Sequence, residues 1–387
     1  MIRFVNAHVV LPGESIANGS VTIDDDRIAA IDAAAGAGCQ DIDCGGAWLL
    51  PGLIDLHCDA IEKEVAPRPK VLFPYPFAIA QIDRRNAMAG ITTPFHALSF
   101  ANDELGMRNN ATAAAVCRAV KQHRGLVDHR VHCRYEITDV EGLDPLLGLI
   151  EDGTMDLLSI MDHTPGQGQF RTLDAYEHYV MGAYQVSRAE ARALADAKIA
   201  GGADAAARVE RLTATARQRG IALASHDDDS PERIETMVAL GSSMSEFPID
   251  LATARAAHEA GLATILGAPN VVRGGSQSGN MRALDAILDG CCDCLCADYH
   301  PASLLQAVFL LGDLAGLQPW QAAALVTANP ARAAGLTDRG RIAVGLRADL
   351  VVARMQGGVA TAEVTCVAGR SVLRTLAPAR ALAEAAT

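Results

Sequence analysis

The first residues that could do chemistry stand at the end of an apolar run, in the stretch AWLLPGLIDLHCD at residues 47–59. This run is too short to span a membrane and is broken by Pro51-Gly52, so a buried strand entered by a turn explains it best. Because alternate side chains of a strand share a face, His57 and Asp59 point to the same side and Cys58 points away. An imidazole and a carboxylate there could bind one divalent ion, although two ligands alone do not define a metal site.

Further ligand-type residues stand at the C-terminal ends of later strand-like segments, which is where barrel enzymes build their active sites. With the first pair they form a set of six: His57, Asp59, Glu136, His163, His226 and Asp298. Imidazoles, a carboxylate able to bridge and a terminal aspartate suit two zinc, manganese or iron ions about 3.5–4 Å apart. Taken singly, His226 could cap a helix, His163 could hydrogen-bond a turn and Glu136 could pair with an arginine. Their shared position nevertheless predicts a site for two divalent metals.

Two basic segments lie close to these residues in the sequence. The segment GAPNVVRGGSQSGN at 267–280 offers several backbone N–H groups near Arg273, and PRPK at 67–70 places Arg68 and Lys70 just beyond the first ligand pair. Arginine and oriented amides suit phosphate oxygens, whereas a flexible barrel loop and solvated charges are the simpler alternatives. We predict that Arg68, Lys70 and Arg273 bind the substrate.

The remaining histidines and cysteines favour structural roles. His132 fits a buried core histidine better than a ligand. The cluster Cys291, Cys292, Cys294 and Cys296 lacks the paired spacing of zinc knuckles, and its period of two sends the last three to one face of a strand, as buried thiols. Ten cysteines in a chain without a secretory signal predict reduced thiols in a cytoplasmic protein.

The segments that must position these residues alternate between apolar strands and alanine-rich helices, the βα pattern of a parallel sheet or barrel. Eight strands are expected, within residues 53–59, 90–98, 129–137, 156–164, 220–228, 243–248, 263–270 and 292–300. Between the fourth and fifth, about 166–219, a stretch rich in Ala, Arg and Glu predicts two or three helices, long enough to form a lid over the mouth.

Both ends of the chain have a different pattern. Valine-rich alternation around glycines predicts short strands in residues 1–50 and 340–387, which we expect to form one small β-sandwich domain beside a barrel at 51–339. The alanine-rich tail from Pro378 could be a helix or disordered.

Composition restricts the partners. No apolar run approaches about 18 residues, which predicts a soluble chain that does not enter a membrane. A net charge of −13 over 387 residues opposes general binding to nucleic acid or acidic membranes. An anionic small substrate would therefore need a local cationic pocket, and the sequence leaves open whether the chain forms a homo-oligomer.

The pattern PGLIDLHCD, the histidines late in the strands, Asp298 and the divided β domain resemble the amidohydrolase superfamily of metal-dependent hydrolases. Members usually begin the barrel with H-x-H, whereas Asp59 here replaces the second histidine. With HCDAIEKEVAPRPK, SIMDHTPGQGQF, ALASHDD, GAPNVVRGGSQSGN and ADYHPASLL, this departure resembles a branch that acts on ribose 1-methylphosphonate 5-triphosphate. The resemblance implies a (β/α)8 TIM-like barrel and metal roles for the six residues above, with Asp298 also as the base for the attacking water. It further implies a phosphorylated sugar as substrate and hydrolysis of its triphosphate to diphosphate and a 5-phosphate.

Two other functions remain open. A bimetal water can also attack a carbonyl, so a deacylase, deaminase or cyclic amidase is the main rival, and the basic segments favour phosphate over it. A non-catalytic barrel scaffold would be expected to lose ligands, whereas all six positions hold competent residues.

Overall fold

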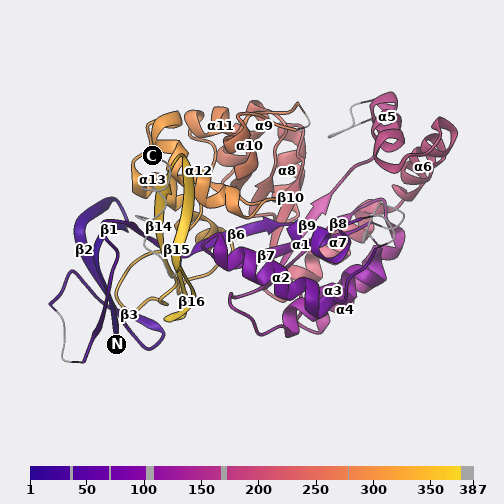
Figure 1. Cartoon of the computed structure of the whole chain (residues 1–387). Coiled ribbons are helices and arrows are strands. Elements are labelled where there is room, and N and C mark those ends of the chain that lie inside the picture. Colours follow the sequence, from indigo (N-terminus) through magenta and orange to yellow (C-terminus); the bar gives the residue numbers. More distant parts are fainter. Residues whose placement is uncertain (35–37, 69–70, 102–108, 167–171, 278, 376–387) are drawn as a thin grey trace.

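The computed structural model describes residues 1–34, 38–68, 71–101, 109–166, 172–277 and 279–375. Within them the chain forms a parallel barrel sheet and a separate, largely antiparallel sheet built from both chain ends, each with eight strands. Figure 1 shows the second sheet, with β1–β3 and β14–β16, to one side of the barrel. The predicted fold class, a barrel with a small β domain from both ends, is confirmed.

The barrel sheet runs through eight parallel strands in sequence order. They are β6 (Leu53–Cys58), β7 (Ile91–Phe100), β8 (Arg130–Glu136), β9 (Leu157–Met161), β10 (Ala222–His226), β11 (Met244–Glu246), β12 (Ala263–Gly267) and β13 (Cys294–Cys296). Each overlaps one of the eight expected segments. A parallel bridge between Cys58 and Asp298 brings the first and last strands together. There the Asp298 amide donates to the His57 carbonyl at 2.9 Å, and the Asp59 amide to the Asp298 carbonyl at 3.1 Å.

Helices follow the strands and cover the outside of the barrel (Figure 1). They are α1 (Ala60–Val65), α2 (Tyr75–Met88), α3 (Asn110–Gln122), α4 (Leu143–Glu151), α8 (Pro231–Ala239), α9 (Leu251–Glu259), α10 (Ala268–Arg273), α11 (Ala283–Asp289), α12 (Ala302–Ala315), α13 (Pro319–Ala324) and α14 (Ala328–Ala333). In α3, the Asn109 side chain caps the first amides, and Ala113, Val116, Cys117 and Val120 form the buried stripe. Their spacing follows the helical period, which explains why an alanine-rich segment packs here.

The long insertion between β9 and β10 contains helices, as expected. They are α5 (Leu173–Tyr184), α6 (Arg188–Gly201) and α7 (Ala205–Gln218). A capping box between Ser187 and Glu190 starts α6. Figure 1 shows α5 and α6 projecting beyond the barrel, while α7 lies against it. No helix in the described ranges is both long and apolar enough to cross a bilayer.

The second sheet joins segments from the two ends of the chain. Its strands are β1 (Ile2–Leu11), β2 (Glu14–Asp24), β3 (Arg27–Ile31), β4 (Gln40–Asp43), β5 (Trp48–Pro51), β14 (Leu350–Gln356), β15 (Val359–Val367) and β16 (Arg370–Arg374). Their order is β16-β15-β14-β5-β1-β2-β3, with β4 also pairing with β1. The seam between the ends is the antiparallel pair β5–β14, where Leu50 faces Val351. The alanine-rich tail from Pro378 lies outside the described residues.

The cysteines are packed as reduced residues. All ten thiols are free, and nine of them are buried. The four clustered cysteines, Cys291, Cys292, Cys294 and Cys296, are all among the buried ones, with the last two fully enclosed. Burial raises the pKa of Cys294 above 9 and keeps its thiol protonated. The prediction of buried thiols in the cluster is confirmed.

Candidate metal centre

One group of ligand-type side chains lies at the barrel seam. His57 is the penultimate residue of β6, Asp59 follows that strand, and Asp298 follows β13. One ligand atom from each lies within 4.8 Å of the other two. The backbone hydrogen bonds that close the barrel link these same residues, so barrel closure itself assembles the group.

A second group lies at the ends of β9 and β10 and consists of His163, His226 and Asp227. The Asp227 carboxylate lies 3.2 Å from Nε2 of His163 and 3.0 Å from Nδ1 of His226. Within the described residues, neither buried ring nitrogen of His226 makes a hydrogen bond of good geometry. Buried imidazole nitrogens seldom lack partners, so the His226 ring suits a metal ligand. Asp227 was not among the predicted ligands. The alternative role of His226, capping the next helix, is not observed, because the N-cap of α8 is Ser230.

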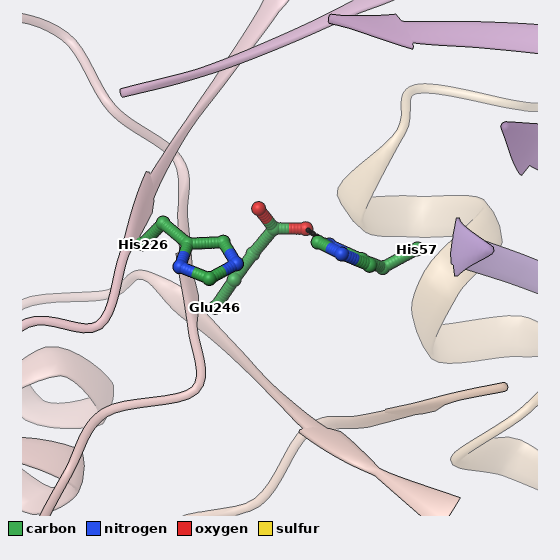
Figure 2. A group of neighbouring side chains, drawn as sticks. All are labelled: His57, His226 and Glu246. Atoms are coloured by element: carbon green, nitrogen blue, oxygen red, sulfur yellow. Dashed lines mark hydrogen bonds and ion pairs between the residues drawn. The ribbon is translucent and has the colours of Figure 1, made fainter. Parts of the chain in front are cut away.

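Glu246, at the end of β11, lies between the two groups. Its Oε1 is 2.9 Å from Nδ1 of His57, and its Oε2 accepts a hydrogen bond from the Ser159 hydroxyl at 2.7 Å. Figure 2 shows the Glu246 carboxylate between the rings of His57 and His226, with the dashed line running to His57. These three residues form a further group of ligand-type atoms within 4.8 Å. Glu246 was also missed, although it occupies a strand end like the predicted residues.

The predicted Glu136 belongs to none of these groups of described residues. It is buried behind His163, whose Nδ1 lies 2.9 Å from Oε2, and it accepts bonds from the Thr138 hydroxyl at 2.9 Å and Lys198 Nζ at 3.2 Å. Burial opposes its ionisation, but Lys198 and then His163 outweigh burial and lower the pKa of Glu136. Its position orients His163 from outside the groups, and a bridging role between metals stays a prediction.

The site carries strong negative charge. Burial raises the pKa of Asp298 to about 7, with the neighbouring Asp59 as the second cause and Arg134 acting in the opposite direction. Nη2 of Arg134 lies 3.9 Å from Oδ2 of Asp59 and 3.4 Å from Oε1 of Glu62. Carboxylates that crowd one another in a buried site are stabilised by a cation, and a divalent ion would supply more charge than Arg134 alone.

The backbone at three strand ends is unusual. Asp227, Phe247 and Asp298 each have positive φ, between 54° and 56°. Non-glycine residues in this left-handed region are uncommon and cost about 1–3 kcal/mol each when the conformation is strained. They follow β10, β11 and β13, and all three line the cavity at the barrel mouth. Such conformations concentrate at functional sites.

The ligand groups open into a cavity of about 240 Å³ at the barrel mouth. Five of the six predicted ligands line it, together with Arg134, Tyr179 of α5 and Arg273 of α10. Arg273 donates to the Tyr299 hydroxyl at 3.4 Å. Arg68 is exposed beyond α1 and is not among the described residues that line this cavity, and its contact with substrate stays a prediction. Lys70 lies outside the described residues.

The residues present fit two divalent metal ions. His57, Asp59 and Asp298 would hold one, and His163, His226 and Asp227 the other, each set combining imidazole nitrogen with carboxylate oxygen. Bound there, the ions would activate water and neutralise charge on a substrate.

Known proteins share sequence with this chain over most of its length. Residues 78–375 match the model of the Amidohydrolase family. The chain is 37% identical over 356 residues to the alpha-D-ribose 1-methylphosphonate 5-triphosphate diphosphatase of Escherichia coli, covering 90% of this chain and 94% of that protein.

Solved structures of low sequence identity share the fold. N-isopropylammelide isopropylaminohydrolase from Burkholderia multivorans gives a TM-score of 0.62 at 16% identity, covering 97% of this chain and 99% of that one. N-acetylglucosamine-6-phosphate deacetylase from Pasteurella multocida gives 0.62 at 13% identity, covering 96% and 99%.

Proposed function

Because the chain belongs to the amidohydrolase family, we propose that it is a metal-dependent hydrolase of a phosphorus-containing acid anhydride. The substrate would be ribose 1-methylphosphonate 5-triphosphate, which water converts to diphosphate and the 5-phosphate while the methylphosphonate is retained. The 37% identical relative bears a name that specifies this substrate. The proposed substrate is thus a small phosphorylated sugar, and the proposed cofactors are two zinc, manganese or iron ions.

One observation carries the choice of phosphate: two arginines line the same cavity as the ligand groups. Arg134 is 5% exposed and stands beside Asp59, while Arg273 lies at the end of α10 with Tyr299. A neutral amide does not require two guanidinium groups, whereas a triphosphate carries charge that they would match. In a chain of net charge −13, these two guanidinium groups lie beside the carboxylates of the ligand groups and would offer an anion positive charge within the catalytic cavity.

Each residue of the site has a proposed role that follows from its position. Asp298 belongs to the first ligand group, and its carboxylate can accept the proton of the attacking water. Glu246 holds the His57 ring, and Glu136 holds the His163 ring. Arg134 and Arg273 would bind phosphate oxygens and stabilise the charge that moves to the departing diphosphate.

The test is a substrate panel with three product assays. The metal-loaded protein is incubated with the proposed substrate, ribose 5-triphosphate, ATP and a set of cyclic and acyl amides, and diphosphate, phosphate and ammonia are measured separately. We expect diphosphate from the ribose triphosphates and little ammonia from any amide. Ammonia or free amine released from amides at a higher kcat/KM than any triphosphate turnover would overturn the proposal in favour of C–N hydrolysis.

A further inference from the structure

A second cavity, of about 550 Å³, lies where the barrel meets the β domain. Its barrel side is the loop that enters β8 at Arg130. Its other side comes from Arg347, which precedes β14, Val367 at the end of β15 and Arg370 at the start of β16. The metal centre stands at the opposite ends of the strands, since Glu136 at the end of β8 contacts His163. The charged residues that line the second cavity are Lys121, Arg124, Asp128, Arg130, Arg347 and Arg370.

The carboxylates near this cavity are already paired. Asp128 lies 3.0 Å from Nη2 of Arg130 and 2.6 Å from Nη1 of Arg339. Asp156 is shared by Lys121 at 2.8 Å and Arg130 at 3.4 Å.

Two arginines of the lining have no acidic partner among the described residues. Arg124 donates only to the main-chain carbonyls of Lys121 and His123, at 3.0 and 3.2 Å. Within the described part of the chain, neither Arg124 nor Arg370 forms an ion pair, and both are exposed. Arg124 belongs to the barrel and Arg370 to the β domain, yet both line one cavity. Cations gathered in this way repel one another until an anion joins them.

A metal ion is the other ligand to consider, because Asp83, His123 and His129 place ligand-type atoms within 4.8 Å beside this cavity. The Asp83 carboxylate already accepts bonds from the amides of Leu126 at 2.9 Å and Val127 at 3.1 Å, and lies 3.0 Å from Nε2 of His129. The surrounding lysine and arginines would also repel a cation. The charge of the cavity therefore selects an anion.

We propose that this cavity binds a small phosphate-bearing anion, held between Arg124 of the barrel and Arg370 of the β domain. Arginine matches phosphate oxygens bidentately, and the cavity volume is in the range of small-molecule sites. The bound anion would cross-link the two domains at a distance from the metal centre. The inference does not depend on which reaction the metal centre catalyses.

Inorganic phosphate is the probe, titrated into the metal-loaded protein at constant ionic strength and followed by calorimetry and amide hydrogen exchange. We expect protection of residues 123–130 and 367–374. The double variant Arg124→Ser/Arg370→Ser should lose that protection and weaken phosphate binding there by about tenfold or more. Both side chains are exposed, so the double variant should fold. If it does not, the single variant Arg370→Gln replaces it, with a smaller expected loss of phosphate affinity.

Two matched variants separate this site from other effects. Arg211→Ser/Arg219→Ser removes the same charge from exposed positions outside the lining, and should leave affinity within about twofold. Arg273→Ala alters the catalytic cavity and should leave the protection at 123–130 unchanged. The proposal is overturned if about 10 mM phosphate protects neither segment, or if the Arg124/Arg370 variant is protected as fully as the parent protein.

Discussion

Nδ1 of His57 lies 2.9 Å from Oε1 of Glu246, and both side chains are almost completely withdrawn from solvent. With Nδ1–H donated to this carboxylate, Nε2 carries the lone pair that a metal would use. Ser159 fixes the other carboxylate oxygen at 2.7 Å, so the orientation of the imidazole is set by residues of β9 and β11. The first ligand of the metal centre is therefore positioned before any ion arrives.

Replacing Glu246 by Gln tests this positioning. The amide oxygen can still accept from Nδ1, but the negative charge that makes the imidazole a stronger ligand is lost. We expect metal affinity to fall by about 10–100-fold. Equilibrium dialysis against a metal buffer measures it, with the exposed Glu259→Gln as control. An affinity within about twofold of the parent would exclude this role for Glu246.

Asp298→Asn tests the proton acceptor. The amide cannot take a proton from water, and the contribution of general base catalysis is about 10²–10⁴-fold. We expect kcat to fall by that range while at least one metal stays bound, as measured by elemental analysis. Turnover within about tenfold of the parent, or about 1.4 kcal/mol of barrier, would be incompatible with the role.

Arg273→Ala tests phosphate recognition at the mouth. The loss of a charge-assisted contact should cost about 1.5–3 kcal/mol in kcat/KM for a ribose 5-triphosphate, and Arg273→Lys should restore only part. A neutral ester turned over by the same centre should lose less. Arg219→Ala is the matched control, because Arg219 is exposed, does not line the cavity and should leave kcat/KM nearly unchanged. Equal losses on both substrates would argue for a structural role of Arg273.

His96 should make stability depend on pH. Burial, and then His129, hold the pKa of His96 well below its usual 6.5. The folded chain keeps His96 neutral while the unfolded chain gains a proton below about pH 6.5, so this contribution is present above that pH and is lost as pH falls. We expect a loss of about 1.4 kcal/mol per pH unit from this residue. Urea unfolding of His96→Gln should show a shallower slope from pH 6.5 to 5 than the exposed His178→Asn; equal slopes would contradict it.

Arg339 should be important for joining the barrel to the β domain. Its buried guanidinium donates to Thr93 Oγ1 at 3.0 Å and lies 2.6 Å from Asp128 and 3.7 Å from the buried Asp349. Arg339→Ala leaves these carboxylates without their shared partner, and should lower the free energy of unfolding by about 3 kcal/mol. Urea denaturation measures it against the exposed Arg341→Ala. A difference under about 1 kcal/mol would show that solvent replaces Arg339.

The barrel could be predicted because its signals are local. Each strand is an apolar run followed by a helical segment, and parallel strands must present their C-terminal ends together. The nearness of His57, Asp59 and Asp298 follows from that rule alone. In contrast, β11 is only three residues long, and a glutamate in so short a run has no clear period. The register between strands, which pairs His226 with Glu246, shows that this glutamate lies beside the ligand groups.

Arg68 shows a second limit of prediction from sequence. In sequence it stands nine residues after Asp59, which suggested that it faces the same mouth. The short helix α1 intervenes, and Arg68 lies exposed beyond it and outside the described lining of the cavity. The direction of a short helix depends on tertiary packing, which a linear pattern does not specify.

The pairing of β5 with β14 also determines when the second sheet can be completed during translation. β5 has β1 on one side and β14 on the other, and about 300 residues of barrel separate β5 from β14 in the chain. At about 5–20 residues per second, roughly 15–60 s of translation leave one edge of β5 without its partner. An open strand edge invites association with other nascent chains, so chaperone dependence during synthesis should be concentrated in this interval. Translation pauses late in the barrel would lengthen it.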